Sequence, residues 1–540
     1  MRVRRVSALF VSLFLMGAVA GCPGRGAVSS KGGPSGNQSS QGASAEDLLK
    51  SAIHQLRPEN FSIAAAPDKP VSLLNSWRGM VADAKPSDAS DNGNAPAFPG
   101  GWASSDEEKR LQSDKYDDLD AVHVRDCLLA QHVAKYLSAR RDDELQRVQE
   151  IFQFVVRNIA LRGDEDLELP LTTYLVLLTG RGSAEDRAWI SAAILRQLHI
   201  DSVIVRPSAD SKPGDDEWLF GVLLNDRIHL FDPRLGLAIP SSIDSAVTNA
   251  PPATLHEISS HPEWLQVLSA RVDQPYSIDA DSLKDPQVMP IVETGFWSRR
   301  MSRLEQVLPT EDACVLFDPP VDDSGRPGMI KRLLAACPIL KADDIKPWPY
   351  PERQREAFRK ASPALKQQID QVQIGFGAPI NVNVDPKTKA AVATAEHTMH
   401  KIRTDQLLGK FEDVTQRYLV IRRLELLESE ANRYPEILQL HRLAAEDAIY
   451  WSGVSKFESA EYDAAIEQLA GYLKKFNRKG RWTFAARSLL AESHAQQSRF
   501  AEAIAAIERT VAEDPYREAN AIRVKLWKSR TKRPVAPSAN

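Results

Sequence analysis

The stretch RGSAEDRAWISAAILRQLHIDSVIVR, residues 181–206, decides the fold class of the middle of this chain. Small and apolar residues recur at helical spacing from Ala188 to Leu195, which predicts a helix over about 183–198. The β-branched run at 202–206 predicts a strand directly after it. A helix that leads straight into a strand indicates that both elements share one core.

The sequence on either side extends this pattern. Four further elements are predicted, namely helices at 120–138 and 142–158 and strands at 218–224 and 227–231. Asn225-Asp226, between the two strands, suits a two-residue hairpin turn. Helices followed by an antiparallel sheet predict an α+β domain, which we place at residues 120–245 of a multidomain α+β protein.

Several motifs occur in a specific order inside this domain. They are Phe154-Val-Val-Arg-Asn-Ile159, Arg181-Gly-Ser-Ala-Glu-Asp-Arg-Ala188, Leu195-Arg-Gln-Leu-His-Ile200, Glu217-Trp218 and His229-Leu-Phe-Asp-Pro233. Together they resemble the transglutaminase-like fold, a superfamily of papain-type cysteine hydrolases and acyltransferases. Members of that family usually carry Arg-Gly-x-Cys-x-Asp-x-Ala at the second motif and His-x-Trp at the fourth. The resemblance covers about a fifth of the chain and implies a papain-type fold.

The resemblance also implies a catalytic triad, and this chain lacks two of its members. The family's chemistry needs a thiolate at a helix N-terminus, an imidazole beside it and an aspartate that orients the imidazole. Ala184 stands at the cysteine position and Asp216 at the histidine position, whereas Asp232 keeps the third residue. A methyl group cannot attack a carbonyl, and a carboxylate cannot replace the imidazole. We therefore expect no catalytic residues, and no cofactor or metal.

A serine enzyme is the rival interpretation. Ser183 precedes the nucleophile position, and His199 or His229 could be imagined as its base. A shift of one residue at a helix start rotates a side chain by about 100°, and Ser183 makes better sense as an N-cap with Asp186 three residues on. An active hydrolase or acyltransferase that uses Ser183 or an unrecognised site stays the alternative. Asp232 has a plain alternative role as a turn residue.

Residues 1–21 have the parts of a bacterial signal peptide. A start with three arginines precedes an uncharged run at 6–20, which is shorter than the roughly 20 residues that span a membrane. The run ends in Val19-Ala20-Gly21-Cys22, which resembles the lipoprotein cleavage box. The resemblance implies a lipid on Cys22 that anchors the exported chain. Pro23 follows, without the aspartate of inner-membrane retention, so we expect the periplasmic face of the outer membrane. The alternative is an ordinary secretory signal.

Composition divides the rest of the chain. The segments are a flexible Gly/Ser tether at 22–44, a helical and loop segment at 45–119, a small α/β segment at 251–350 and a helical region at 351–534. Within them we predict short helices near 48–56 and 71–81, helices at 294–308 and 328–337, a strand at 313–317 and a helical break at 375–385.

Residues 446–515 contain a weak internal repeat. Tyr462-Asp-Ala-Ala-Ile-Glu467 aligns with Phe500-Ala-Glu-Ala-Ile-Ala505 at an offset of 38, and Gly453 aligns with Ala491. The pattern resembles a pair of tetratricopeptide helix hairpins, whose period is about 34. In that family small residues let the helices cross closely, and the concave side of the stack binds peptides or proteins. The alternative is a purely structural helical cap on the preceding domain.

The other candidate residues have ordinary structural interpretations. Cys127 is most simply a small buried hydrophobe, while Cys314 and Cys337 could pair in an exported protein, a question that we leave open. His397 and His400 are expected on one helix, but a metal site would need a third ligand.

The net charge of −4, which loss of the signal peptide makes more negative by three, argues against nucleic acid as a partner. The sequence therefore predicts a non-catalytic lipoprotein of the cell envelope. We expect it to bind or scaffold protein or peptide partners through a degenerate transglutaminase-like domain and tetratricopeptide-like helices. We expect it to reach the membrane through its lipid anchor.

Overall fold

The computed structural model describes most of the chain between Ser44 and Thr531. The described residues are 44–60, 67–84, 105–163, 166–208, 214, 217–242, 251–271, 273, 275–319, 327–338, 340–341, 345–384, 386–387, 391–422, 435–476 and 479–531. The signal peptide, Cys22 and the tether up to residue 43 lie outside the described residues, and so does Asp216.

The described part of the chain begins with helices that pack on the middle of the molecule. They are α2 (Ala45–Leu56), α3 (Asp68–Ala84) and α4 (Ser105–Gln112), with a 3-10 turn at Pro58–Asn60. Ser44 and Asp47 form a capping box at the start of α2, and its buried face carries Ile53 and Leu56. The two short helices predicted near 48–56 and 71–81 are confirmed. The segment 85–104 lies outside the described residues.

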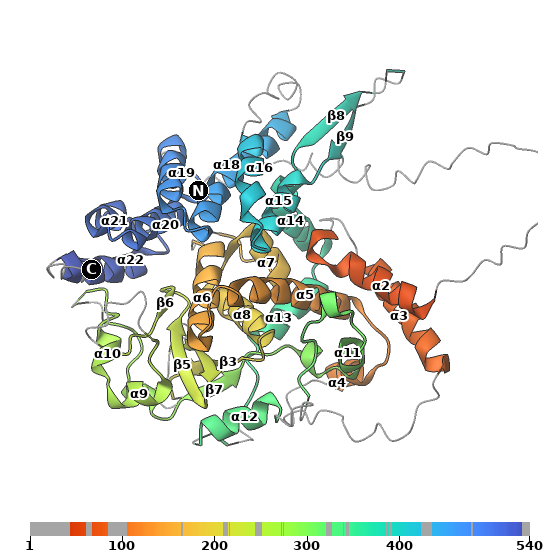
Figure 1. Cartoon of the computed structure of the whole chain (residues 1–540), viewed down its shortest axis with the longest axis horizontal. Coiled ribbons are helices and arrows are strands. Elements are labelled where there is room, and N and C mark those ends of the chain that lie inside the picture. Colours follow the sequence, from red (N-terminus) through yellow and green to blue (C-terminus); the bar gives the residue numbers. More distant parts are fainter. Residues whose placement is uncertain are drawn as a thin grey trace, which may run out of the picture.

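A five-stranded antiparallel sheet and the helices against it form the middle of the molecule (Figure 1). The helices are α5 (Asp118–Ser138), α6 (Glu144–Asn158), α7 (Thr173–Thr179) and α8 (Ala184–Arg196). The sheet has the order β6-β5-β4-β3-β7, with β3 (Asp201–Arg206), β4 (Leu219–Leu224), β5 (Arg227–Asp232), β6 (Leu237–Ala238) and β7 (Gln287–Pro290). A short parallel pair, β1 (Ala160–Leu161) and β2 (Arg181–Gly182), precedes α8. The prediction of mixed helix and sheet is confirmed.

The β4–β5 hairpin turns where the sequence indicated. Asn225 and Asp226 both have positive φ angles, of 50° and 57°, as a two-residue turn of type I′ requires. The register pairs Leu224 with Arg227 and Phe220 with Phe231. Phe220 and Phe231 lie in the core beside Phe152 of α6. The hairpin therefore fixes which face of the sheet packs on α6.

Residues 251–350 complete this sheet. Their strand β7 pairs antiparallel with β3, and helices α9 (Leu255–Ser260), α10 (Glu263–Gln266), α11 (Arg299–Glu305) and α12 (Met329–Ala336) lie around it. The helix predicted at 328–337 is confirmed. The one predicted at 294–308 is interrupted, because a 3-10 turn at Thr294–Trp297 gives way to extended backbone at Ser298 before α11 begins.

The strand predicted at 313–317 is wrong. The segment is extended without a strand partner, because side chains take the place of a neighbouring strand. Gln197 both donates to the Val315 carbonyl, at 3.1 Å, and accepts from the Val315 amide, at 2.8 Å. Glu305 Oε2 accepts from the amides of Leu316 and Phe317. The apolar pattern indicated burial correctly, but burial and sheet pairing are separate properties.

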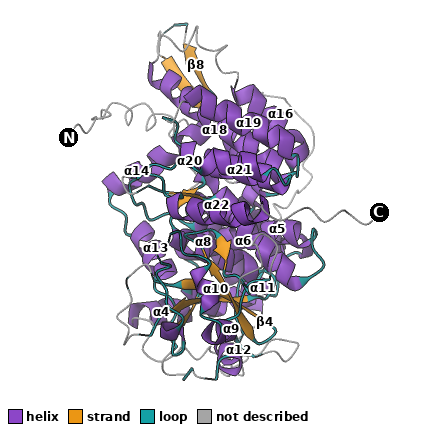
Figure 2. Ribbon diagram, turned by 90° about the vertical axis from the view of Figure 1, so that its left-hand side faces the viewer, coloured by secondary structure: helices purple, strands orange, loops and turns teal. Residues whose placement is uncertain are grey.

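Helices dominate from residue 350 onward. They are α13 (Tyr350–Arg359), α14 (Pro363–Gln373), α15 (Thr398–Leu407) and α16 (Phe411–Arg422), followed by α18 (Pro435–Glu458), α19 (Tyr462–Phe476), α20 (Thr483–Gln496), α21 (Phe500–Ile507) and α22 (Arg517–Thr531). The predicted break is confirmed and extends further, since a hairpin of β8 (Ile380–Val384) and β9 (Ala391–Ala395) fills it. Figure 2 shows α18 to α21 in the upper part of the molecule, with α22 below them and β4 near the bottom.

The internal repeat has a structural counterpart. Ala460 and Ser498 are 38 residues apart, and both adopt a φ of 59° in the turn between two helices. Each turn is closed in the same way, by a bond from Glu461 N to Lys456 O and from Arg499 N to His494 O. At Gly453 an added Cβ would lie 2.8 Å from Leu469, so a small residue is needed where α18 crosses α19. The α18–α19 and α20–α21 pairs are therefore equivalent helix hairpins.

The helical end is fixed tightly to the middle of the molecule. Arg403 of α15 is fully buried and donates to the Leu177 carbonyl at 2.9 Å, while its guanidinium lies 3.5 Å from the centre of the Trp451 ring. Gly180 has a φ of +66°, and any side chain there would overlap the same ring. One continuous apolar core runs from Leu49 to Leu526. The hairpins and the sheet-bearing part are thus held at a defined distance.

Candidate functional site

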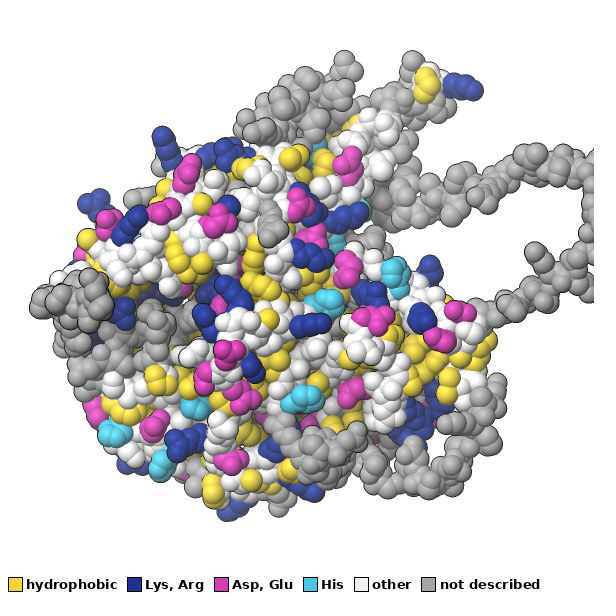
Figure 3. Space-filling model, viewed as in Figure 1, with side chains coloured by type: hydrophobic (Ala, Val, Ile, Leu, Met, Phe, Trp, Pro, Cys, Tyr) yellow, Lys and Arg dark blue, Asp and Glu magenta, His cyan; other side chains and the backbone are white. Residues whose placement is uncertain are grey.

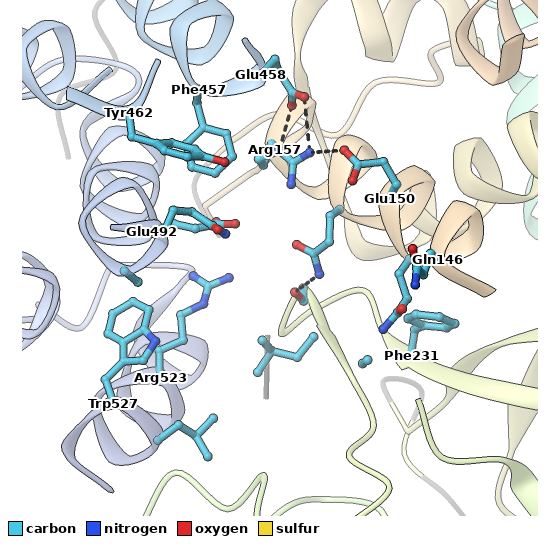
Figure 4. Close-up of a pocket in the computed structure, with 18 of the residues that line it drawn as sticks. Gln146, Glu150, Arg157, Phe231, Phe457, Glu458, Tyr462, Glu492, Arg523 and Trp527 are labelled. Atoms are coloured by element: carbon cyan, nitrogen blue, oxygen red, sulfur yellow. Dashed lines mark hydrogen bonds and ion pairs between the residues drawn. The ribbon is translucent and has the colours of Figure 1, made fainter. Parts of the chain in front are cut away.

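A groove of about 460 Å³ lies between α6, the β5–β6 edge of the sheet and the helices α18 to α22 (Figure 4). We call it the α6 groove. Its lining includes Gln146, Gln153, Arg157, Phe457, Tyr462 and Arg523. The groove lies where the two helix hairpins face the sheet-bearing part, so neither part could form it alone.

The polar face of α6 forms one wall. Asp143 caps the helix by accepting from the Gln146 amide, and the apolar face buries Ile151 and Phe152 against the sheet. Because α6 is amphipathic, its opposite face turns Gln146, Gln149 and Gln153 toward the groove. The Gln153 carboxamide donates to the Gly236 carbonyl at 3.4 Å. This wall offers carboxamides, which can both donate and accept hydrogen bonds.

The two hairpins form the opposite wall with equivalent positions. Phe457, Glu458 and Tyr462 of the first hairpin line the groove, and so do the residues 38 positions further on. Those are Ala495, Gln496 and Phe500. Phe457 and Tyr462 meet edge to face with ring centres 5.3 Å apart. Tyr462 and Phe500, which occupy equivalent positions of the internal repeat, both keep part of their surface exposed.

One end of the groove is a compact ion-pair network. Arg157 Nε lies 2.8 Å from Glu458 Oε1, and Arg157 also lies 3.6 Å from Glu150. Burial alone would lower the pKa of Arg157, but the carboxylate of Glu458 raises it above the ordinary value. Arg140 and Arg141 complete the network through Glu150. These charges satisfy one another, so this end is a rigid wall.

The other end carries cations without such partners. Arg523 Nη1 donates to Ser488 Oγ at 2.7 Å, and the Arg530 guanidinium lies 5.5 Å from the centre of the Phe500 ring. Burial lowers the pKa of Arg530. Within the described part of the chain, no carboxylate lies within ion-pair distance of Arg523 or Arg530. Five arginines and three glutamates line the groove as a whole, so it is positive on balance.

The first turn of α8, where the family resemblance places a nucleophile, differs from the groove because its polar side chains are bonded to one another. Ser183 is the N-cap, and it forms a capping box with Asp186, as the sequence predicted. Tyr350 Oη donates to Asp186 Oδ1 at 2.9 Å and lies 3.3 Å from Ser183 Oγ. Burial raises the pKa of Asp186. Ala184 itself is 9 % exposed. The hydrogen-bond partners of Ser183 are therefore those of a cap, with a tyrosine covering it.

Asp232 ends β5 as a turn residue. Its Oδ1 accepts from the amides of Arg234 and Leu235, at 2.8 and 3.1 Å, and its Oδ2 accepts from Tyr276 Oη at 2.7 Å. It is completely buried. Arg187 links this turn to α8 by donating to the Pro233 carbonyl at 2.9 Å. Asp216, which the family resemblance places at the histidine position, lies outside the described residues.

A cysteine, a histidine and an acid do meet, but elsewhere and inside the core. Cys127 Sγ lies 3.8 Å from His123 Nε2, and His123 Nδ1 lies 3.5 Å from Glu293. Burial raises the pKa of the Cys127 thiol well above its ordinary value, which disfavours the thiolate that a nucleophile needs. Cys127 and His123 are 4 % and 1 % exposed, so substrate has no route to them. The spacing of four on one helix was visible in the sequence, but the distant Glu293 was not.

The other cysteines and histidines that the sequence singled out do not come together in one site. Cys127, Cys314 and Cys337 are all buried, and none of the three is in a disulfide. His397 is not on a helix with His400, because it adopts a φ of 54° just before α15 begins. His400 is buried against the Tyr174 hydroxyl, and burial lowers the pKa of His400 to about 4. No sequence pattern singled out Arg523 and Arg530, because their place in the groove depends on which helices α22 faces.

Comparison of the chain with family models, with curated proteins and with solved structures gave no match. Among the helices that the structure describes, none combines the length and apolar character needed to cross a bilayer. The face seen in Figure 3 has basic and acidic side chains interspersed. What the site can do therefore follows from its own chemistry. The described residues that line the α6 groove offer carboxamides, cations and aromatic rings, and include no serine, cysteine or histidine.

Proposed function

We propose that this chain is an exported, lipid-anchored protein of the cell envelope that binds a protein or peptide partner in the α6 groove without catalysing a reaction. The observation that carries the proposal is the composition of the groove. Equivalent positions of two successive helix hairpins face a row of carboxamides on α6. Hairpin stacks of this kind typically use such surfaces for peptide recognition.

The resemblances in the sequence support the same proposal. The order of α8, β3 and the β4–β5 hairpin agrees with that expected of a transglutaminase-like domain, and the paired hairpins agree with tetratricopeptide-type repeats. The residue at the nucleophile position is Ala184, and Ser183 and Asp232 are engaged in a cap and a turn. A degenerate catalytic domain that keeps a recognition surface is consistent with these contacts. The anchor at Cys22 comes from the cleavage box alone.

Site-specific photocrosslinking tests the proposal. A crosslinking residue replaces Gln153 in the groove and, as a control, the exposed Lys360 on the far end of α13. In cell envelopes we expect a discrete peptide or protein adduct at position 153 and none at position 360. A Cys22→Ser variant should leave the membrane fraction. Equal adducts at both positions would refute binding in the groove.

The serine-enzyme rival is tested in the same samples. A fluorophosphonate probe labels activated serines, and we expect no labelling because Ser183 Oγ is bound by Tyr350 and the helix start. Labelling that disappears in Ser183→Ala would establish the rival instead.

A further inference from the structure

We infer that the α6 groove takes an extended acidic peptide segment of about five residues, whose carboxylate side chains bind at Arg523 and Arg530. The inference rests on the proposed function and names the chemistry of its partner. It is carried by the unequal charge of the two ends of the groove. It is independent of the resemblance to any family.

The charge argument begins with the paired end. Arg157 and Glu458 form a buried ion pair that Glu150 extends, so a ligand charge there would have to disrupt existing bonds. Arg523 keeps one neutral partner, the Ser488 hydroxyl, and Arg530 stacks on Phe500. A guanidinium has five N–H donors, so each of these two retains donors for a ligand. A carboxylate that reaches this end would gain charge-assisted bonds without displacing an ion pair.

The α6 wall of the groove indicates how long the bound peptide is and how its backbone is recognised. Gln146 and Arg157 both line the groove and are separated by about 16 Å along the helix axis, given a rise of 1.5 Å per residue. An extended peptide covers that distance with about five residues, at roughly 3.3 Å each. Carboxamides along this wall match the alternating N–H and C=O groups of such a peptide. The partly exposed rings of Tyr462 and Phe500 then contact its side chains.

Fluorescence anisotropy with the full chain tests the inference. The probes are labelled pentapeptides rich in Glu, the same peptides with Gln for Glu, and the same with Lys for Glu. We expect the Glu series to bind about tenfold more tightly than the Gln series, and this difference to shrink as salt is raised. Arg530→Ala should weaken Glu-peptide binding by about tenfold.

Matched variants separate the role of charge from loss of folding. Lys528→Ala removes an exposed cation from the same helix, outside the groove, and should leave affinity unchanged. If Arg523→Ala proves unstable, Arg523→Lys takes its place, because lysine keeps the positive charge. Gln153→Glu adds a negative charge to the groove and should weaken binding of the Glu peptides. Equal affinity for the Glu and Gln series would overturn the inference and leave the proposed function standing. Failure of every peptide to bind would overturn both. Binding of an acidic oligosaccharide in place of peptides would overturn both in favour of a sugar-acid ligand.

Discussion

The first turn of α8 and the α6 groove differ in how completely their polar groups are satisfied. At α8, Ser183, Asp186 and Tyr350 bond one another, and little surface is exposed. In the groove, Arg530 and the rings of Tyr462 and Phe500 are partly exposed, and Arg523, which is 8 % exposed, keeps donors beyond its bond to Ser488. A closed network rigidifies a core, whereas unsatisfied donors at a surface are available to a ligand. The motif at the start of α8 thus has a structural role, whereas the groove in which we propose binding lies at the boundary between two parts of the molecule.

The largest expected effect is a loss of stability at Gly180, whose close approach to Trp451 of α18 supports both regions. In Gly180→Ala the new methyl group would overlap the Trp451 ring at a backbone φ of +66°. We expect the free energy of unfolding to fall by about 4 kcal/mol, from steric overlap plus left-handed strain. Denaturant titration measures it. Gly471→Ala is the matched control, since nothing lies near its added Cβ, and it should stabilise α19 by about 0.5–1 kcal/mol. Similar results for both variants would contradict the close docking of α18.

Glu293, which accepts a hydrogen bond from Trp189 of α8, should contribute to the acid sensitivity of the fold. Burial opposes ionisation of Glu293, but Arg355 lowers the pKa of Glu293 from 4.5 to about 2, with help from Trp189 of α8. A pKa that is lower in the folded state stabilises the protein above pH 4.5, and this stability is lost as the pH falls toward 2. We expect a loss of about 3 kcal/mol from this residue across that window.

Glu293→Gln checks the acid-sensitivity prediction. It should be less stable at neutral pH, because Arg355 loses its carboxylate, and its unfolding free energy should depend less on pH between 4.5 and 2. Parallel curves for the two proteins, measured by denaturant titration at each pH, would show that Glu293 carries no such linkage.

The smallest expected effect is a difference in the rate at which cysteines placed in the two regions are alkylated. Cysteines introduced as Ala184→Cys and Gln153→Cys report on the two regions, and mass spectrometry of alkylated peptides distinguishes them from the native buried thiols. We expect position 153 to react roughly tenfold faster or more, because burial limits both access and thiolate formation at position 184. Faster reaction at position 184 would mean that the helix N-terminus is still an accessible, activated position.

Local patterns allowed much of the fold to be predicted. The helix–strand stretch at 181–206, the Asn225-Asp226 turn and the repeat offset of 38 are short-range signals, and the structure follows each. The segment 313–317 was mistaken for a strand because its partners are side chains, namely Gln197 just after α8 and Glu305 of the nearby α11. Cap and turn roles for Ser183 and Asp232 were foreseeable. The groove was not, because its two walls come from segments more than 300 residues apart.

The Tyr516 hydroxyl has a consequence for how the protein is made. It accepts a hydrogen bond from the Leu161 amide at 2.9 Å, across 355 residues of chain. During synthesis or export the early part of the chain must therefore wait, with Leu161 and the neighbouring Arg187 uncovered, until the last helices arrive. The groove is assembled at the end of this process. A chain truncated before Tyr516 would lack Arg523 and Arg530 of the α6 groove and would also leave polar groups of the first-made half without their final partners.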